Sequence, residues 1–378
     1  MDKIVAGTEN ERDCLVSVEP SKDLEIVIQA KVERVYDEQI ENLARKCLEN
    51  YGVEKAKVTI NEKGALDYVI KARLDFALSL FTGKTIKEKG IKRKVTPKDR
   101  ARRSRLYVPG NNPRLLINAG VFGSDCIILD LEDSVSLEQK GAARYLVKEA
   151  LKTLDFGNSE IWVRVNKEFL EDDLRQVMIG APHGICLPKS ECREDIERAV
   201  ELIERYEDIY DVKETKLMPI IESAKGIVNL EEVASSSDRI VALAFGAEDF
   251  TRDIGGEKSW DKLLFARSRI VVVAKAFGIQ ALDTVYSDVE DVEGLIEETK
   301  RIVKMGFDGK GAIHPEQIGY IHSCFTPTQD EIEYAKRIIE ALEDAKRKGS
   351  GVVSLDGKMI DKPIVKRAER ILKLGGIL

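Results

Sequence analysis

From residue 104 onward the chain repeats one pattern, a short apolar run followed by a helical stretch, and this repetition limits the possible folds more than any other feature. The runs are SRLYVPGN, CIILDLED, IWVRVN, GICLPKSE, KLMPIIES, IVALAFGAEDF, IQALDTVY and FDGKGAIHP. Nearly continuous apolar strands that alternate with helices are typical of parallel strands buried on both faces. Eight such units in ~250 residues predict an α/β fold of the (β/α)8 barrel type. An open doubly wound sheet is the alternative, but no GxGxxG follows the first strand to favour it.

The segment before the barrel has a different pattern. Residues 13–30 contain two alternating runs, CLVSV and LEIVIQA, which predict a short hairpin. Next, Ile40, Ala44 and Leu48 recur at helical spacing, and Gly52 lies just past the end of that helix. A further strand, AKVTI, and a second helix follow. The pattern predicts a small α+β domain.

Charge and composition indicate where the domains begin and end, and they argue against one class of protein. We expect the α+β domain at 1–80, a Lys- and Arg-rich linker at 81–101, the barrel at 102–350 and a C-terminal extension at 351–378. The linker is interpreted as solvated, with a basic patch for an acidic partner or for nucleotide phosphates as the alternative. The net charge of −7 argues against general nucleic-acid binding.

The cysteines and the hydropathy pattern bear on location. The six cysteines form no CxxC pair, which argues against a structural zinc site and favours reduced thiols. No segment approaches ~18 uninterrupted apolar residues, so no membrane span is expected. We therefore expect a cytoplasmic protein.

Polar residues gather where the predicted barrel strands end, and functional groups of such barrels lie at the carboxyl ends of the strands. They are Asp130, Glu132, Asp133, Arg164, Asn166, Lys189, Glu191, Glu222, Glu248, Asp249, Asp283 and His314. Carboxylates without a cysteine or histidine cluster suit a hard cation, so Mg²⁺ is expected rather than Zn²⁺. Arg164, on an otherwise apolar strand, suits bidentate binding of a substrate carboxylate. Any single carboxylate has an alternative role as a helix cap, and His314 is interpreted as a loop residue.

These motifs carry a resemblance. Residues 102–376 resemble the β subunit of citrate lyase, the citryl-thioester lyase, through RSRLYVPGN, LDLEDSVS, WVRVN, LPKSE, IESAKG, GAEDF and GVVSLDGKMIDKP. Several of these motifs are shared with the wider HpcH/HpaI aldolase family, which includes malyl-CoA and citramalyl-CoA lyases. The resemblance therefore implies the type of reaction more strongly than the substrate.

The N-terminal segment resembles the γ subunit of citrate lyase, an acyl carrier. AGT at 6–8, KGALD at 63–67 and KARLDFAL at 71–78 carry that match. In the γ family a serine after the AGT loop bears a phosphoribosyl-dephospho-CoA arm. Here Glu11 stands at that place, and Ser17 lies within a predicted strand. A covalent arm on this chain is therefore not expected.

The resemblance also implies roles for particular residues. It places Mg²⁺ on Glu222 and Asp249, with Glu222 also contacting substrate, and gives Arg164 a substrate carboxylate. Glu132 is a weaker catalytic candidate that orients a ligand or binds the metal through water. Asp361, in LDGKMIDKP, is the proton-transfer candidate because an aspartate in this segment of related lyases reaches a neighbouring subunit. The alternative is that Asp361 caps the helix that follows, and the two roles are compatible.

The expected function is a Mg²⁺-dependent retro-Claisen cleavage of a citryl thioester, citryl-CoA or a carrier-bound citryl group, into oxaloacetate and an acetyl thioester. One alternative is a malyl-CoA or citramalyl-CoA lyase that acts on free CoA thioesters. Another is a non-catalytic assembly subunit. The resemblance implies a homo-oligomer, a trimer or a multiple of one, and a citrate lyase α-like transferase subunit as a possible partner.

Overall fold

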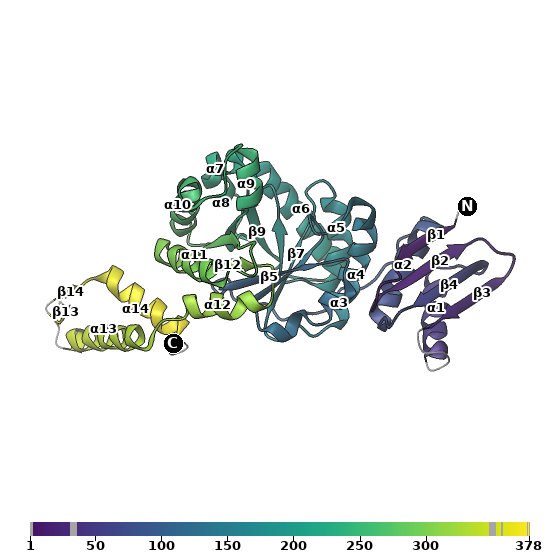
Figure 1. The fold of residues 1–378 in the computed structure, drawn as a ribbon, viewed down its shortest axis with the longest axis horizontal. Helices are drawn as coiled ribbons and strands as arrows, with labels where there is room; N and C mark the ends of the chain where they lie inside the picture. The colour runs from purple at the N-terminus through teal and green to yellow at the C-terminus, as the bar shows by residue number, and fades with distance from the viewer. Residues whose placement is uncertain (1–2, 31–35, 348–352, 357, 376, 378) are drawn as a thin grey trace.

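The computed structural model describes residues 3–30, 36–347, 353–356, 358–375 and 377. Figure 1 shows three parts along the long axis: a small N-terminal module, a central barrel, and a pair of helices at the C-terminal end. None of the helices in the described part of the chain combines the length and apolar character needed to cross a membrane.

The central part confirms the predicted barrel. Its eight strands all run parallel and close in the order β10-β11-β12-β5-β6-β7-β8-β9. They are β5 Ser104–Pro109, β6 Cys126–Asp130, β7 Glu160–Arg164, β8 Gly184–Leu187, β9 Lys216–Ile221, β10 Ala242–Phe245, β11 Gln280–Val285 and β12 Gly309–Ala312. Each apolar run named above therefore became a strand of the barrel.

Helices follow the strands around the outside of the barrel (Figure 1). They are α3 Pro113–Leu116, α4 Lys140–Thr153, α5 Leu170–Val177, α6 Arg193–Tyr210, α7 Ala224–Val228, α8 Leu230–Ala234, α9 Ala247–Asp253, α10 Trp260–Ala276, α11 Val292–Met305 and α12 Glu316–Phe325, with short 3-10 turns at Ala119–Phe122, Leu137–Gln139 and Met178–Gly180.

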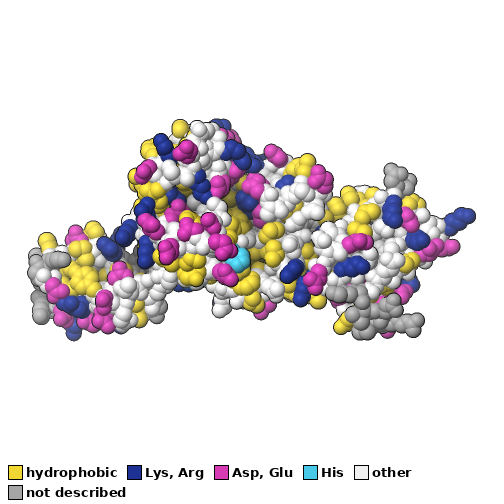
Figure 2. All heavy atoms as spheres, viewed as in Figure 1, with side chains coloured by type: hydrophobic (Ala, Val, Ile, Leu, Met, Phe, Trp, Pro, Cys, Tyr) yellow, Lys and Arg dark blue, Asp and Glu magenta, His cyan; other side chains and the backbone are white. Residues whose placement is uncertain are grey.

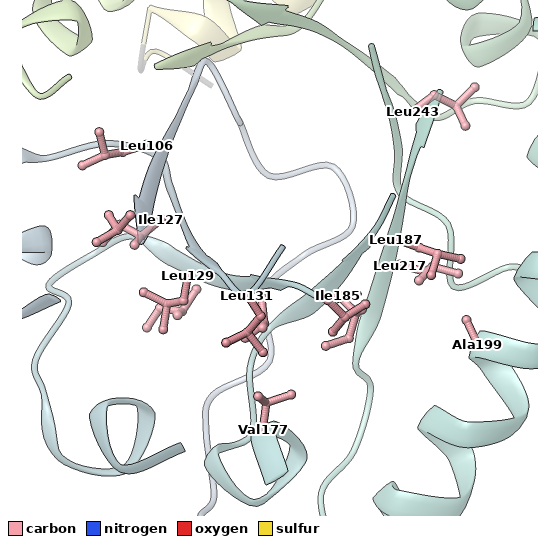
Figure 3. Close-up of a cluster of buried hydrophobic side chains, with 14 of the residues drawn as sticks. Leu106, Ile127, Leu129, Leu131, Val177, Ile185, Leu187, Ala199, Leu217 and Leu243 are labelled. Atoms are coloured by element: carbon pink, nitrogen blue, oxygen red, sulfur yellow. The ribbon is translucent and has the colours of Figure 1, made fainter. Parts of the chain in front are cut away.

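Side chains of the strands alternate between two hydrophobic layers. Leu129, Leu131 and Ile185 point away from the ring of strands, toward the side of Val177 and the surrounding helices (Figure 3). Strand residues that alternate with these, such as Ile128 and Cys186, form a second buried cluster with Trp162 and Met218. This alternation is what a closed barrel requires, and it decides which strand residues can face a ligand.

The basic linker lies against the amino end of the barrel, so the interpretation as a simply solvated segment was incomplete. Arg102, the first residue after the linker, is buried and forms a bidentate ion pair with Glu160, with Nε to Oε2 at 2.6 Å. Arg93 donates to the backbone carbonyl oxygens of Leu151 and Ala181. On the barrel face seen in Figure 2, basic and acidic side chains are interspersed.

The N-terminal module is a four-stranded sheet with two helices, in the strand order β1-β2-β4-β3. Its elements are β1 Ile4–Gly7, β2 Cys14–Glu19, β3 Leu24–Gln29, α1 Asp37–Tyr51, β4 Ala56–Glu62 and α2 Asp67–Thr82. The predicted hairpin was wrong, because β4 lies between β2 and β3 and pairs with both. The alternation of apolar and polar residues identified the two strands correctly. Which strand each of them pairs with depends on contacts with a third strand that is distant in sequence.

After the barrel come α13 (Gln329–Arg347), the two short strands β13 (Val353–Leu355) and β14 (Lys358–Ile360), and α14 (Lys362–Leu374). The helices α13 and α14 pack on each other through a small apolar cluster that includes Ala335, Ile338 and Ala368. Lys373 of α14 forms an ion pair with Asp99 of the linker.

Candidate active site at the carboxyl end of the barrel

A cavity of about 440 Å³ opens at the carboxyl ends of the barrel strands. Its lining includes Asp130, Arg164, Glu222 and Asp249, which the sequence singled out. Two larger hollows, of about 580 and about 780 Å³, lie at the amino end of the barrel. Those hollows lie away from the strand ends where barrels of this kind position functional groups, so the mouth is the candidate site.

Glu222 directly follows β9 and is 5% exposed. Its Oε1 accepts a hydrogen bond of 2.7 Å from the backbone N–H of Lys189. Burial and the neighbouring carboxylates of Glu132 and Asp249 raise its pKa to about 8, despite the opposing effect of that hydrogen bond. A buried carboxyl surrounded by like charges is in a setting that a cation would stabilise.

Asp249 belongs to the first turn of α9, after the neighbouring strand β10. Its Oδ1 accepts from Arg252 at 2.8 Å. Between the two acids lies Gly246, where a Cβ atom would come within 2.4 Å of the Glu222 Oε2. The glycine therefore allows the backbone to approach the Glu222 carboxylate.

The donor set fits Mg²⁺. This ion prefers oxygen ligands, and it is usually held by one or two carboxylates together with substrate oxygens and water. Glu222 and Asp249 supply two such carboxylates at one wall of the cavity. The raised pKa of Glu222, caused first by burial and then by the Glu132 and Asp249 carboxylates, is a shift that a bound cation would oppose.

Arg164 lies at the end of β7 and is already engaged by protein carboxylates. Its Nε and Nη2 each donate to Asp130 at 2.7 Å, which occupies one bidentate edge of the guanidinium. Its Nη1 lies 2.9 Å from the Glu132 Oε2, and the group stacks over the Tyr107 ring at 5.3 Å. Burial alone would raise the pKa of Asp130, but Arg164 outweighs burial and lowers it. Nη1 also donates to the Asp133 Oδ2 at 3.4 Å, so protein carboxylates contact both edges of the guanidinium.

Glu132 is buried between two cations. Its Oε1 accepts from the Lys189 Nζ at 2.9 Å, and Oε2 makes no hydrogen bond despite its proximity to Arg164. Burial raises the pKa of Glu132, with Arg164 acting in the opposite direction. Lys189 adopts a left-handed backbone conformation, with φ of 50°, so that its N–H meets Glu222 while its side chain meets Glu132.

Arg105 was missed as a site residue, although it lies within the RSRLYVPGN motif. It is 1% exposed, lines the mouth cavity and points into the barrel, where Nη1 lies 3.7 Å from the Met218 sulfur. A usable signal existed in the sequence. Arg105 alternates with Leu106 along an apolar strand, just as Arg164 alternates with Val163, and such an arginine must face the inside of the barrel.

Several strand-end residues do not join this site. The Asp283 carboxylate pairs with Arg267 and Lys310, both at 2.9 Å. Glu248 does line the cavity, but it is exposed and its carboxylate pairs with Lys258. The exposed His314 fits its interpretation as a loop residue.

Asp361 lies in the C-terminal part of the chain and not among the cavity residues. Its Oδ1 accepts from the backbone N–H of Ile364 at 3.1 Å, so it caps α14. Within one chain, Glu222, Asp249, Arg164 and Glu132 come together and Asp361 does not.

In the N-terminal module, Glu11 is exposed in the turn between β1 and β2. Ser17 is buried within β2, as the sequence predicted. The AGT and KARLDFAL motifs meet at Asp13, which accepts from the Thr8 hydroxyl at 2.8 Å and pairs bidentately with Arg73 at 3.0 Å. The two short motifs thus form one structural unit.

Two family models match the chain. Residues 103–315 match the HpcH/HpaI aldolase/citrate lyase family. Residues 1–81 match an acyl-carrier family described as the malonate decarboxylase delta subunit, which supports an acyl-carrier-like fold for the N-terminal module.

Curated and solved relatives cover most of the barrel and the C-terminal part. A citrate lyase subunit beta from Leuconostoc mesenteroides subsp. cremoris is 44% identical over 73% of this chain and 94% of its own length. A mitochondrial citramalyl-CoA lyase from Rattus norvegicus is 35% identical over 72% of this chain and 86% of its own. The solved structure of the CitE protein from Mycobacterium tuberculosis, in complex with magnesium, acetoacetate and coenzyme A, is 31% identical. It covers 74% of this chain and 100% of that chain, with a TM-score of 0.60.

Proposed function

The chain belongs to the HpcH/HpaI aldolase/citrate lyase family and is a carbon–carbon lyase, and on that premise we propose that it cleaves a citryl thioester into oxaloacetate and an acetyl thioester. The observation that carries the proposal is the pair Glu222 and Asp249, two carboxylates on neighbouring strand ends in the mouth cavity. The citrate lyase subunit beta at 44% identity supports citryl as the acyl group.

In the proposed mechanism Glu222 and Asp249 would hold Mg²⁺, which would supply Lewis-acid polarisation of the substrate oxygens. Arg164, which lines the cavity, donates to a substrate carboxylate, and Asp130 fixes the orientation of its guanidinium. Glu132, held by Lys189, lies beside Arg164 and orients the ligand through that guanidinium. These contacts fix the substrate hydroxyl and the scissile carbon–carbon bond in one geometry.

The reaction needs a base for the tertiary hydroxyl proton. As that proton leaves, the hydroxyl carbon becomes the ketone of oxaloacetate, and the electron pair of the broken carbon–carbon bond passes to the thioester fragment as an enolate. Protonation of the enolate gives the acetyl thioester. We assign this proton transfer to Asp361 of a second copy of the chain, because within one chain Asp361 does not line the cavity.

The form of the substrate follows from the N-terminal module. Glu11 stands where a carrier serine is expected, and Ser17 is buried in a strand. The substrate is therefore free citryl-CoA or a citryl group on a separate carrier protein. Citramalyl-CoA is the second candidate, favoured by the citramalyl-CoA lyase at 35% identity.

The direct test measures Mg²⁺-dependent release of oxaloacetate from citryl-CoA by the full chain, with citramalyl-CoA and malyl-CoA alongside. We expect rapid cleavage of citryl-CoA that EDTA abolishes and excess Mg²⁺ restores. A preference of more than tenfold for either of the other thioesters would replace citryl with that acyl group. No turnover of any of the three would contradict the proposed function.

The assignment of Asp361 is tested by mixing two inactive variants, Glu222→Ala and Asp361→Ala, after joint unfolding and refolding. If Asp361 acts in the site of a neighbouring copy, random assembly gives intact sites, with ~25% of wild-type activity for a ring-shaped oligomer. No recovery in a mixture that demonstrably forms hetero-oligomers would contradict action in trans.

A further inference from the structure

Arg105 differs from the other buried arginines in its charge balance. Among the described residues, three others are as deeply buried, and each pairs with a carboxylate: Arg73 with Asp13, Arg102 with Glu160, and Arg267 with Asp283. No Asp or Glu oxygen of the described chain lies within 4.0 Å of the Arg105 guanidinium. Its described partners are the backbone oxygen of Asp283 and the Met218 sulfur, and its Nε has no partner.

The surroundings of Arg105 make an unpaired charge unfavourable. Its neighbours inside the barrel belong to the inner apolar cluster, which includes Trp162 and Met218. Taking a guanidinium out of water into such surroundings costs free energy unless an anion or enough hydrogen bonds compensate it. Arg105 lines the mouth cavity, so an anion that enters the cavity can reach it.

The position of Arg105 also fits a ligand bound at Glu222 and Asp249. On β5, Tyr107 lies beneath Arg164 near the top of the cavity. Arg105 comes two residues earlier on the strand, ~7 Å deeper into the barrel. Arg164 is charge-balanced by Asp130 and Glu132, whereas the deeper arginine is not. A carboxylate bound at the floor of the cavity, next to Arg105, would therefore compensate more unpaired charge than one bound next to Arg164.

We propose that Arg105 is a specificity-determining residue that binds the second carboxylate of the oxo-acid half of the substrate. This inference rests on the proposed function. Citryl-CoA has a CH₂COO⁻ group where citramalyl-CoA has a methyl group, and the products are oxaloacetate and pyruvate. The guanidinium forms charge-assisted hydrogen bonds with the extra carboxylate. With a methyl group at this place it stays unpaired, so the site disfavours the smaller substrate.

The main test compares kcat/KM for citryl-CoA and citramalyl-CoA in the wild type and in Arg105→Met. Methionine removes the charge and suits the apolar surroundings. We expect kcat/KM for citryl-CoA to fall roughly 100-fold and that for citramalyl-CoA to stay within about threefold. Equal losses on both substrates, or no loss on citryl-CoA, would overturn the inference. Arg198→Met, on the outer face of α6, controls for the general effect of an arginine-to-methionine change.

A second measurement covers the case in which Arg105→Met does not fold or the wild type cleaves neither thioester. Titration calorimetry with Mg²⁺ present gives the affinities of the wild type for oxaloacetate and pyruvate. We expect oxaloacetate to bind at least about tenfold more tightly, and Arg105→Lys to reduce that ratio because lysine lacks the planar fork. Equal affinities in the wild type would overturn the role of Arg105. A wild type that discriminates the acids but cleaves no thioester would refute the proposed function alone.

Discussion

Two buried carboxylate clusters can be compared in this molecule. One lies at the barrel mouth and contains Glu132, Glu222 and Asp249. The other lies where α2 of the N-terminal module packs on α4 of the barrel and contains Asp75, Glu88 and Glu149, whose oxygens are close enough to share a cation. From residue types alone, both clusters are candidate metal sites.

The second cluster is already neutralised by the protein. Lys71 contacts Asp75 at 2.5 Å and Glu149 at 2.9 Å. Lys148 contacts all three acids, and Lys152 pairs with Glu88 and Glu149. Three ammonium groups thus balance three carboxylates. The cluster joins the N-terminal module to the barrel, and the structure offers no reason to add a metal ion to it.

Glu88 and Glu222 show the difference most directly. Burial alone would raise the pKa of both, but Lys148 and Lys152 bring that of Glu88 down to about 2. At Glu222 the adjacent carboxylates act with burial, and the pKa rises to about 8. Burial still raises the pKa of Asp75 within the lysine cluster, so the distinction rests on the neighbouring charges: lysines surround Glu88, whereas carboxylates act on Glu222.

The largest effect is expected from Glu222→Gln. Removal of a metal-binding carboxylate should lower kcat/KM by roughly 10³-fold, with thermal stability retained because the amide occupies the same volume. The matched control is Glu88→Gln, the same change in the other cluster, which should lower stability and leave kcat/KM within about twofold. The comparison fails if Glu88→Gln inactivates the enzyme or Glu222→Gln leaves it active.

Lys148→Met should have the largest effect on stability. It leaves three buried carboxylates with too few cations, and breaking such a buried network costs about 3–5 kcal/mol. Urea unfolding would measure this loss of stability, and hydrogen exchange would show whether it affects α2. Lys189→Met, at the half-exposed lysine of the mouth, should cost less than about 1 kcal/mol. If Lys148→Met and Lys189→Met lowered the free energy of unfolding by similar amounts, the proposed contrast between the two clusters would be contradicted.

The two clusters should make the free energy of unfolding depend on pH in opposite directions. Because Glu222 has a folded-state pKa above its ordinary 4.5, the metal-free protein loses stability as pH rises from 4.5 to about 8, by at most about 1.4 kcal/mol per pH unit. Glu88 has a lowered pKa, so its contribution is complete above 4.5 and is lost as pH falls toward about 2.

Melting curves between pH 3 and 9, with and without Mg²⁺, would test both directions. Mg²⁺ should bind more tightly as pH rises to about 8, with release of a proton. Glu222→Gln should remove this pH-dependent contribution. A wild-type Mg²⁺ affinity that does not change between pH 6 and 8 would show that Glu222 is already ionised.

The smallest effect concerns Asp361, which belongs to neither cluster. Asp361→Ala should destabilise α14 by about 1 kcal/mol through loss of the N-cap, whereas Asp361→Asn should cost only a few tenths because asparagine also caps helices. Circular dichroism during thermal unfolding would show the difference. If Asp361 also transfers the proton, both variants lose activity, so the activity of Asp361→Asn separates capping from catalysis.

Much of the fold could be predicted locally. The eight apolar runs became the eight barrel strands because each segment alone is apolar enough to be buried on both faces. Gly52, with φ of 67°, ends α1 as predicted because glycine tolerates the left-handed conformation. The hairpin between β2 and β3 was mispredicted because the pairing partner of both strands, β4, comes more than 25 residues later in the chain.

The candidate site, too, was predicted from the sequence in part. Strand-end position brought Arg164, Glu222 and Asp249 together at the cavity, with Glu132 beside Arg164, because parallel strands all end at one rim. The same criterion also included Asp283, whose carboxylate turns to Arg267 and Lys310, and it passed over Arg105, which lies within its strand.

The sequence by itself determined the order of strands and helices, the type of barrel and the kinds of side chain available at its mouth. The tertiary structure decided which charges are compensated. Compensation depends on distances of a few ångströms between residues far apart in the chain, such as Lys71 and Glu149 at 2.9 Å, and electrostatic energy in a buried setting depends steeply on those distances. The sequence therefore indicated the carboxylates of the mouth, but only the folded chain brings the second cluster together and distinguishes the one neutralised by lysines from the one that still requires a cation.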